Sequence, residues 1–197
     1  MIYNKYSSLI LVILIIVKEV INMKYFENIV YGTQYYRAPT PLPSEWEQDI
    51  MKMDELGIDT MQIRVQWRQN ERGEDNYYFD DVDKLFELAQ KHNKKVIFKF
   101  LIENAPQYIF DKYDGTRRNA DGTPIVPSSH GAFYVGGWLP CFDNDKVIER
   151  AKKFVNVFTE RYHRQSSLVL WNVWNEPRTR PVGDCSCEHC KKDGENI

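Results

Sequence analysis

The stretch that decides the fold is Leu168-Val169-Leu170-Trp171-Asn172-Val173-Trp174, which runs directly into Asn175-Glu176-Pro177. A strongly apolar run of this kind predicts a buried strand. Because the run is followed by Asn-Glu, the strand would present an amide and a carboxyl group together at the edge of a sheet. A strand that ends in a solvated glutamate is the plain alternative, and the rest of the chain decides between the two.

Strands and helices alternate along the chain before this point. Besides 168–174, the pattern predicts strands over residues 28–36, 61–65 and 95–101. The helices between them have recognisable starts and stops. The first opens with the capping box Ser44-x-x-Glu47 and ends at Gly57, the second is capped by Asp80, and the third has its apolar face over residues 147–158. Strands joined by single helices imply parallel pairing through right-handed crossovers.

The same pattern narrows the fold class. No Gly-x-Gly-x-x-Gly follows any predicted strand, so a dinucleotide-binding sheet has no support. In a barrel the chemistry lies at the carboxyl ends of the strands. Here these ends carry Tyr35, Tyr36 and Arg37, then Arg64 and Trp67, then Glu103 and Asn104, then Asn175 and Glu176. We therefore predict an α/β fold, a (β/α)8 TIM barrel of which this chain supplies about the first four β/α units. An open doubly wound sheet is the alternative.

Composition excludes one class of function. The 197 residues are 43% hydrophobic and 14% aromatic, which is enough to bury a core and gives no sign of disorder. The formal net charge is −2, without a basic stripe, so we expect no nucleic-acid partner. The many aromatic side chains suit a carbohydrate site, although core packing alone also accounts for them.

A carboxyl group at the end of a buried strand has a specific chemical use. Glycoside hydrolysis needs a carboxyl group that gives a proton to a leaving oxygen and later takes one back. Trp171 and Trp174 flank this position as flat apolar surfaces of the kind on which sugar rings stack. In this segment the chain resembles the retaining glycosidases of clan A, whose acid/base Glu follows an Asn at the end of barrel strand 4.

From about residue 31 to residue 190 the chain is similar to the first half of a β-galactosidase of glycoside hydrolase family 42. The matching pieces are Tyr31-Gly32-Thr33-Gln34-Tyr35-Tyr36 with Trp46 and Asp49, the strand Gln62-Ile63-Arg64, Trp67 with Glu71, Phe79-Asp80, and Asn175-Glu176. The resemblance implies a barrel that hydrolyses terminal β-galactosyl or related β-glycosyl linkages with retention, and a homo-trimer in the full-length protein.

The resemblance also assigns roles to residues. It implies that Glu176 is the acid/base, that Asn175 donates to the sugar 2-hydroxyl and that Arg64 helps to hold charge at the barrel mouth. We further expect Tyr35, Trp67 and Trp174 to contact the carbohydrate substrate. Residues 135–140 contain no arginine, whereas family members usually carry one shortly before the cysteine of this loop. This departure leaves galactose specificity open, with a neighbouring clan A family as the alternative.

All four cysteines fall late in the chain, at Cys141, Cys185, Cys187 and Cys190. Thiolates in a Cys-x-Cys-x-x-Cys arrangement plus one distant Cys can complete a tetrahedral zinc site, and the spacing to Glu176 matches the zinc cluster of family 42. With no water ligand, the Zn²⁺ would be structural and not catalytic. Chance placement or two disulfides are the alternatives, and His189 could replace one thiolate.

The N-terminus carries an apolar run from Leu9 to Val17. No small-x-small cleavage motif follows it, and the run is shorter than the roughly 20 residues of a transmembrane helix. Met23 opens a segment that resembles a natural start, so we interpret residues 1–22 as an upstream extension. Export or membrane anchoring through residues 7–22 is the alternative. Zinc-binding thiolates suit a reducing compartment, which favours a cytoplasmic enzyme.

Residues 23–197 are short for a complete barrel, which takes about 250 residues. A retaining glycosidase needs two carboxylates about 5–5.5 Å apart, and the resemblance places the nucleophile at the end of strand 7, beyond this chain. Glu71 and Glu103 each follow a strand and could substitute, but we expect them to bind substrate or to lie on solvated loops. We therefore predict the N-terminal half of a catalytic domain, inactive alone. The alternative is a non-catalytic, zinc-stapled carbohydrate-binding module whose stacking platforms are Tyr35, Tyr36, Trp67, Trp138 and Trp174.

Overall fold

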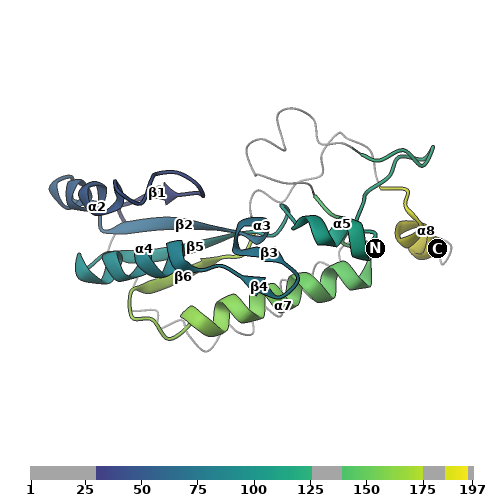
Figure 1. Ribbon diagram of the computed structural model, residues 1–197. Helices are drawn as coiled ribbons and strands as arrows, with labels where there is room; N and C mark the ends of the chain where they lie inside the picture. The colour runs from purple at the N-terminus through teal and green to yellow at the C-terminus, as the bar shows by residue number, and fades with distance from the viewer. Residues whose placement is uncertain (1–29, 126–138, 175–184, 195–197) are drawn as a thin grey trace.

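The computed structural model describes residues 30–125, 139–174 and 185–194 (Figure 1). The strands are β1 (Gly32–Tyr36), β2 (Thr60–Gln66), β3 (Glu71–Gly73), β4 (Asn76–Tyr77), β5 (Lys95–Leu101) and β6 (Leu168–Asn172). The helices are α2 (Trp46–Glu55), α3 (Trp67–Asn70), α4 (Asp80–Lys91), α5 (Gln107–Tyr113), α7 (Asp145–Tyr162) and α8 (Glu188–Gly194). Within these ranges, no helix combines the length and the apolar character needed to cross a membrane.

The main sheet has four parallel strands in the order β1-β2-β5-β6. Each of these strands lies beside the one that precedes it along the chain, and α2, α4 and α7 lie in the connections between them. A doubly wound sheet reverses its strand order at a switch point, whereas a barrel adds each new strand on the same side. The strand order therefore confirms the predicted partial (β/α)8 barrel.

The first helix begins differently from the prediction. α2 starts at Trp46, with Glu45 and not Ser44 at the N-cap position, and no side chain caps it. The Glu45 carboxylate instead accepts a hydrogen bond from the Leu42 backbone N–H (2.8 Å). The expected capping box is thus replaced by a bond that stabilises the turn before the helix. Gly57 does end this segment, with φ of 70°.

Other boundaries also shift by a few residues. Asp80 is the first residue of α4 and not its cap, because Phe79 holds the N-cap position without a side-chain hydrogen bond. Asp80 then acts through its charge, which is favourable in the first turn of a helix. The strand predicted over 168–174 ends at Asn172. Regular structure also appears in loops for which none was predicted, as the β3–β4 hairpin and α5.

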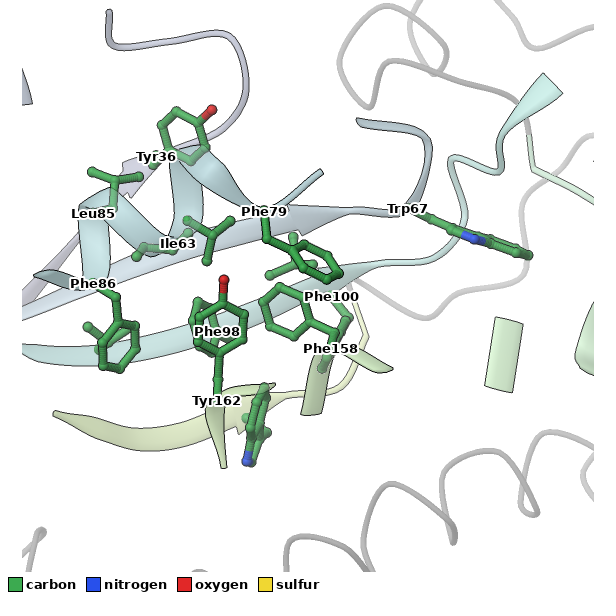
Figure 2. Close-up of a cluster of buried hydrophobic side chains, with 14 of the residues drawn as sticks. Tyr36, Ile63, Trp67, Phe79, Leu85, Phe86, Phe98, Phe100, Phe158 and Tyr162 are labelled. Atoms are coloured by element: carbon green, nitrogen blue, oxygen red, sulfur yellow. The ribbon is translucent and has the colours of Figure 1, made fainter. Parts of the chain in front are cut away.

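Aromatic side chains fill the layer between the sheet and its helices (Figure 2). Phe98 and Phe100 of β5 lie with ring centroids 4.9 and 5.5 Å from Phe158 of α7. Trp171 of β6 stacks on the same two β5 rings at 5.4 and 5.7 Å, and Tyr162 of α7 lies 5.2 Å from Phe98. Rings of this size contribute most of the buried apolar area, so they determine which face of the sheet packs against the helices.

The residues that alternate with these core side chains project from the opposite face of the sheet. We call this the inner face, because in a complete barrel it lines the interior. In β2 the fully buried Ile63 and Val65 belong to the helix-side core, which leaves Gln62 and Arg64 on the inner face. Register pairs extend the inner face to the neighbouring strands, from Gln34 through Gln62, Arg64 and Lys99 to Asn172.

Candidate active-site edge and cysteine cluster

Arg64 lies in the middle of the inner face. Its register partner is Lys99 on β5, and Lys99 is in turn the partner of Asn172 on β6. The Arg64 guanidinium donates a hydrogen bond to Oε1 of Gln34, so β1 orients the charge that β2 supplies. This placement suits the predicted role of Arg64 at the barrel mouth, which stays a prediction.

Side-chain amides join the loops at the carboxyl ends of β1, β2 and β5. Gln66, the last residue of β2, donates to the Ala38 carbonyl (3.1 Å) and accepts from Asn104 Nδ2 (3.2 Å). Asn70 Oδ1 accepts from the Gln66 backbone N–H (3.0 Å), and Asn70 Nδ2 donates to the Tyr78 carbonyl (2.9 Å). These buried amides hold three loops in a fixed arrangement at the edge where a barrel places its chemistry.

A cavity of about 380 Å³ opens at this same edge. Most of its lining side chains are polar or charged, and they come from the loops after β1, β2 and β5: Ala38, Gln66, Arg68, Gln69, Glu71, Arg72, Asn104, Pro106 and Gln107. A polar hollow at the carboxyl ends of barrel strands is the expected place for a hydrophilic ligand. Of these lining residues the sequence pointed to Asn104 and Glu71, whereas no signal indicated Gln66 or Gln107.

Trp67 lies in the core and does not face a ligand. It has no exposed surface, and its ring stacks on Phe154 of α7 with centroids 6.1 Å apart. Its indole N–H donates to Glu71 Oε2 at 2.6 Å. A sugar ring needs an accessible aromatic face, so the expectation that Trp67 contacts substrate is corrected by its burial. Apolar packing partners, which sequence spacing did not reveal, explain the difference.

Glu71 is likewise a buried structural residue, and not the substrate ligand or solvated side chain that was expected. Its carboxylate has no exposure and accepts from Arg150 Nη2 (2.8 Å) and from the Asp75 backbone N–H (2.9 Å), besides Trp67. Arg150 also donates to Asp75 Oδ1 at 2.6 Å. Hydrogen bonds from Arg150 and then Lys153 hold the pKa of Asp75 well below its usual range.

Arg150 was missed by the sequence analysis although a signal was present. It lies on α7 in the row of buried residues with Val147, Ala151 and Phe154. A charged residue inside an otherwise apolar helical stripe indicates a buried ion pair. Glu103 also departs from the expected solvated loop, since both of its carboxyl oxygens are buried.

Two more of the predicted substrate-binding residues, Tyr35 and Trp174, lie in the described ranges, the first against α2 and the second against Phe142. The Tyr35 hydroxyl lies 3.2 Å from Asp49 Oδ2 on α2 and donates to it. Burial, together with the Asp49 carboxylate, raises the pKa of Tyr35, so the phenol stays a hydrogen-bond donor to the helix. This contact holds the Tyr35 hydroxyl against α2, but the side chain is only partly buried, so its expected contact with the substrate stays a prediction. Trp174 is half-buried, and its ring lies 5.7 Å (centroid to centroid) from that of Phe142, the residue that follows Cys141 in the sequence.

Three of the predicted functional residues fall outside the described ranges. They are Asn175, Glu176 and Trp138, and so the predicted acid/base role of Glu176 stays a prediction. The same holds for the N-terminal residues 1–22. The described part of β6 ends at Asn172, on the inner face beside Lys99, and Val173 and Trp174 continue from it toward Asn175.

The four cysteines converge at one place, although Cys141 is far from the others in sequence. Their sulfur atoms all lie within 4.8 Å of one another, and all four are free thiols in the structure. The Cys141 sulfur lies 3.4 Å from that of Cys187 and 3.5 Å from that of Cys190. Zn–S bonds of about 2.3 Å in a tetrahedron place sulfurs roughly 3.8 Å apart. The observed spacing therefore fits a four-thiolate zinc ion.

The chemistry of this donor set also fits a cation. Burial, reinforced by Cys187, raises the pKa of the Cys141 thiol, and burial together with Asp143 raises that of Cys190. Thiolates packed this closely repel one another unless a metal supplies positive charge, and a coordinating thiol is deprotonated outright. Backbone hydrogen bonds from Cys141 to Gly115 and from Ser186 to Arg118 tie the cluster to the loop after α5. The His189 ring contacts Asn144 and not the sulfurs.

Comparison with known sequences identifies relatives of one kind. The sequence profile of the glycoside hydrolase family described as β-galactosidase matches residues 35–194. A β-galactosidase of Haloferax lucentense is 27% identical over 147 residues, which cover 74% of this chain and 21% of that protein. A β-galactosidase of Bacillus licheniformis is 27% identical over 158 residues, covering 76% of this chain and 22% of the relative. The chain thus spans between a fifth and a quarter of the length of these relatives.

Solved structures give the same result for the fold. The crystal structure of a β-galactosidase from Bacillus circulans sp. alkalophilus superposes with a TM-score of 0.68 at 23% identity, covering 83% of this chain and 23% of that one. A cold-adapted β-galactosidase from Rahnella sp. R3 gives 0.69 at 19% identity, with 86% and 24% coverage. The likeness supports the partial barrel deduced from the strand order.

Proposed function

The chain belongs to glycoside hydrolase family 42, and from this premise we propose that it supplies the acid/base half of the active site of a retaining β-glycosidase. The proposed substrates are carbohydrates with terminal β-galactosyl or related β-glycosyl linkages. Glu176 would give its proton to the leaving oxygen and later take one from water. Asn175, Arg64 and Trp174 would hold the sugar.

The observation that carries the proposal is the parallel sheet β1-β2-β5-β6 with its polar carboxyl edge. This edge combines an oriented Arg64, the amide network around Gln66 and a polar cavity, and β6 leads from it toward Asn175 and Glu176. Preorganised amides at such an edge can orient sugar hydroxyls, and the Arg64 cation favours the ionised form of carboxylates near it. The alternative of a non-catalytic binding module is weakened, because Trp67 and Tyr36, two of its stacking platforms, are buried.

We expect the second carboxylate of the mechanism to come from outside the described residues. Glu71 is fully buried and bound by Arg150, so its carboxylate has no open face for attack on a sugar carbon. A retaining reaction needs two carboxylates about 5–5.5 Å apart. We therefore expect residues 23–197 alone to hydrolyse a nitrophenyl β-galactoside negligibly, and robust retaining turnover would overturn this expectation.

We further propose that Cys141, Cys185, Cys187 and Cys190 hold a structural Zn²⁺. A zinc ion with four thiolates leaves no position for water or substrate, so it would stabilise the loops and take no part in the reaction. The cluster of free, converging thiols supports this assignment. A cytoplasmic location and a homo-oligomer, such as a trimer, remain further parts of the proposal.

The decisive experiment uses the polypeptide that carries this chain in its own host. The intact mass of that polypeptide is first compared with 23.4 kDa, the mass of the 197 residues. In that polypeptide Glu176→Gln should lower turnover of alkyl β-galactosides about 10²–10⁴-fold, the usual contribution of a general acid. Nitrophenyl substrates, which need less proton donation, should lose less. The control is Glu160→Gln on the exposed side of α7. Unchanged rates for Glu176→Gln with both substrates would refute the assignment.

A further inference from the structure

The inner face contains a buried lysine that the proposed chemistry does not use. Lys99 is 8% exposed, and it makes no ion pair or hydrogen bond with any residue in the described ranges. Its neighbours Phe98 and Phe100 lie in the helix-side core, so the alternation of the strand places Lys99 on the inner face. Lysines are rarely buried to this extent unless they are paired.

Lys99 also lies beside a second cation, which raises the cost of burying it without a partner. Arg64 is its register partner on the adjacent parallel strand. Like charges directly opposite one another in a sheet are destabilising, and burial in a medium of low dielectric constant increases the cost. The buried Lys99 ammonium beside the Arg64 guanidinium therefore needs a negatively charged partner of its own.

A buried acceptor lies next to this cationic pair. Oε1 of Gln62 is buried and has no hydrogen-bond partner among the described residues. Gln62 lies two residues before Arg64 on the same face, opposite Ile97, so it is a diagonal neighbour of Lys99. An unsatisfied buried acceptor needs a donor such as a hydroxyl group. The inner face thus offers cations for a carboxylate and an acceptor for a nearby hydroxyl.

We propose that Lys99, with Arg64 and Gln62, binds a sugar that carries a carboxylate, so that the barrel acts on β-linked hexuronosyl residues in addition to, or in place of, neutral galactosyl residues. The carboxylate accepts from the Lys99 ammonium beside Arg64, and a ring hydroxyl donates to Gln62 Oε1. This inference rests on the proposed glycosidase function and assigns its substrate class. The same negative charge could also come from a carboxylate of the protein, and the test separates these two sources.

The test measures binding of D-galacturonate and D-galactose, by isothermal titration calorimetry, to the full polypeptide that carries this chain. We expect galacturonate to bind at least tenfold more tightly than galactose. Lys99→Met should abolish that preference without weakening galactose binding, and Lys99→Arg should preserve it. The matched control is Lys95→Met, which removes a lysine from the same strand that is already paired with Asp59 (3.0 Å). Circular dichroism verifies the fold of each variant.

Several results would overturn the inference. Equal affinity for the two monosaccharides, or a preference that survives in Lys99→Met, would exclude a role for Lys99 in recognising the carboxylate. Failure of the full wild-type polypeptide to bind galacturonate would overturn the inference and favour a protein carboxylate as the partner of Lys99. Galactoside hydrolysis by the full polypeptide without any galacturonate preference would refute only this inference, whereas galacturonate binding without glycoside hydrolysis would refute only the proposed function.

Discussion

Arg150→Met is the perturbation whose effect the structure determines most directly. Arg150 Nη2 lies 2.8 Å from a carboxylate oxygen of Glu71, and the Glu71 side chain has no exposed surface. Methionine preserves the apolar stem but removes the charge, which leaves Glu71 with the Trp67 indole and the Asp75 N–H as donors. Breaking a buried ion pair by removing one partner costs about 3–5 kcal/mol. For a chain of this size that corresponds to a decrease in Tm of roughly 6–20 °C.

The assay is urea unfolding of the 197-residue chain, followed by tryptophan fluorescence and far-ultraviolet circular dichroism. The matched control is Lys153→Met, which removes the other cation bound to Asp75 (2.7 Å). Both partners of that second pair are about half exposed, at 49% and 44%, so its loss should cost at most about 1 kcal/mol. The double variant Glu71→Gln/Arg150→Met should recover part of the loss, because a neutral buried amide replaces an unpaired carboxylate. If Arg150→Met costs less than about 1 kcal/mol, or if the double variant is less stable than Arg150→Met, the buried pair does not stabilise this edge as argued.

Other predictions follow from the same geometry. The purified chain should contain one zinc per polypeptide by atomic absorption, Cys187→Ser should lose it, and His189→Gln should keep it; a metal-free chain would contradict the cluster assignment. Arg150 and Lys153 lower the pKa of Asp75, so the ionised Asp75 adds to the free energy of unfolding; this addition is complete above the ordinary aspartate pKa and is lost as the pH falls below it. Arg150→Met should therefore lose less stability between about pH 5 and pH 3 than the wild type does. Equal losses in the two proteins would exclude this linkage. Gly115→Ala should destabilise the chain by about 1–3 kcal/mol and weaken zinc retention, because the new Cβ would lie 2.7 Å from Ile109 Cγ2 and 2.9 Å from the Ile109 carbonyl. The control is Gly122→Ala, whose Cβ would meet no atom within 4 Å although the residue has φ of 83°. Its effect measures backbone strain alone, without a steric clash.

Much of the fold was predictable because its signals are local and periodic. The run 95–101 forms β5 as predicted, and the strand order follows from single-helix connections that leave few alternatives. The convergence of Cys141 with Cys187 was also predictable, since cysteine spacing carries its own chemistry. Helix starts were less predictable, because Glu45 and Phe79 hold the N-cap positions without a side-chain cap.

The candidate site was predicted less well, for a physical reason. Whether an aromatic or acidic residue after a strand faces a ligand or the core depends on its tertiary partners. Trp67 and Glu71 follow β2 at positions typical of a binding site, yet Phe154 and Arg150 of α7 bury both of them. Those partners lie some 80 residues later in the sequence. Lys99 was overlooked for a related reason, since a lysine within a strand reads as solvated until the strand register places it beside Arg64.

Helix α7 connects the two parts of the candidate site. At its N-terminus Asn144 accepts from the Lys146 N–H (3.0 Å), donates to the Tyr113 carbonyl (2.7 Å) and contacts His189 (3.0 Å), which adjoins the cysteines. One to two turns later Arg150 binds Glu71, the first residue of β3, and beyond it Phe158 packs on β5. A metal at the cysteines would therefore act on the strand ends through a rigid helix that both anchors share. By holding the N-terminal end of α7, the proposed zinc ion would also stabilise the position of Arg150 and its ion pair with Glu71.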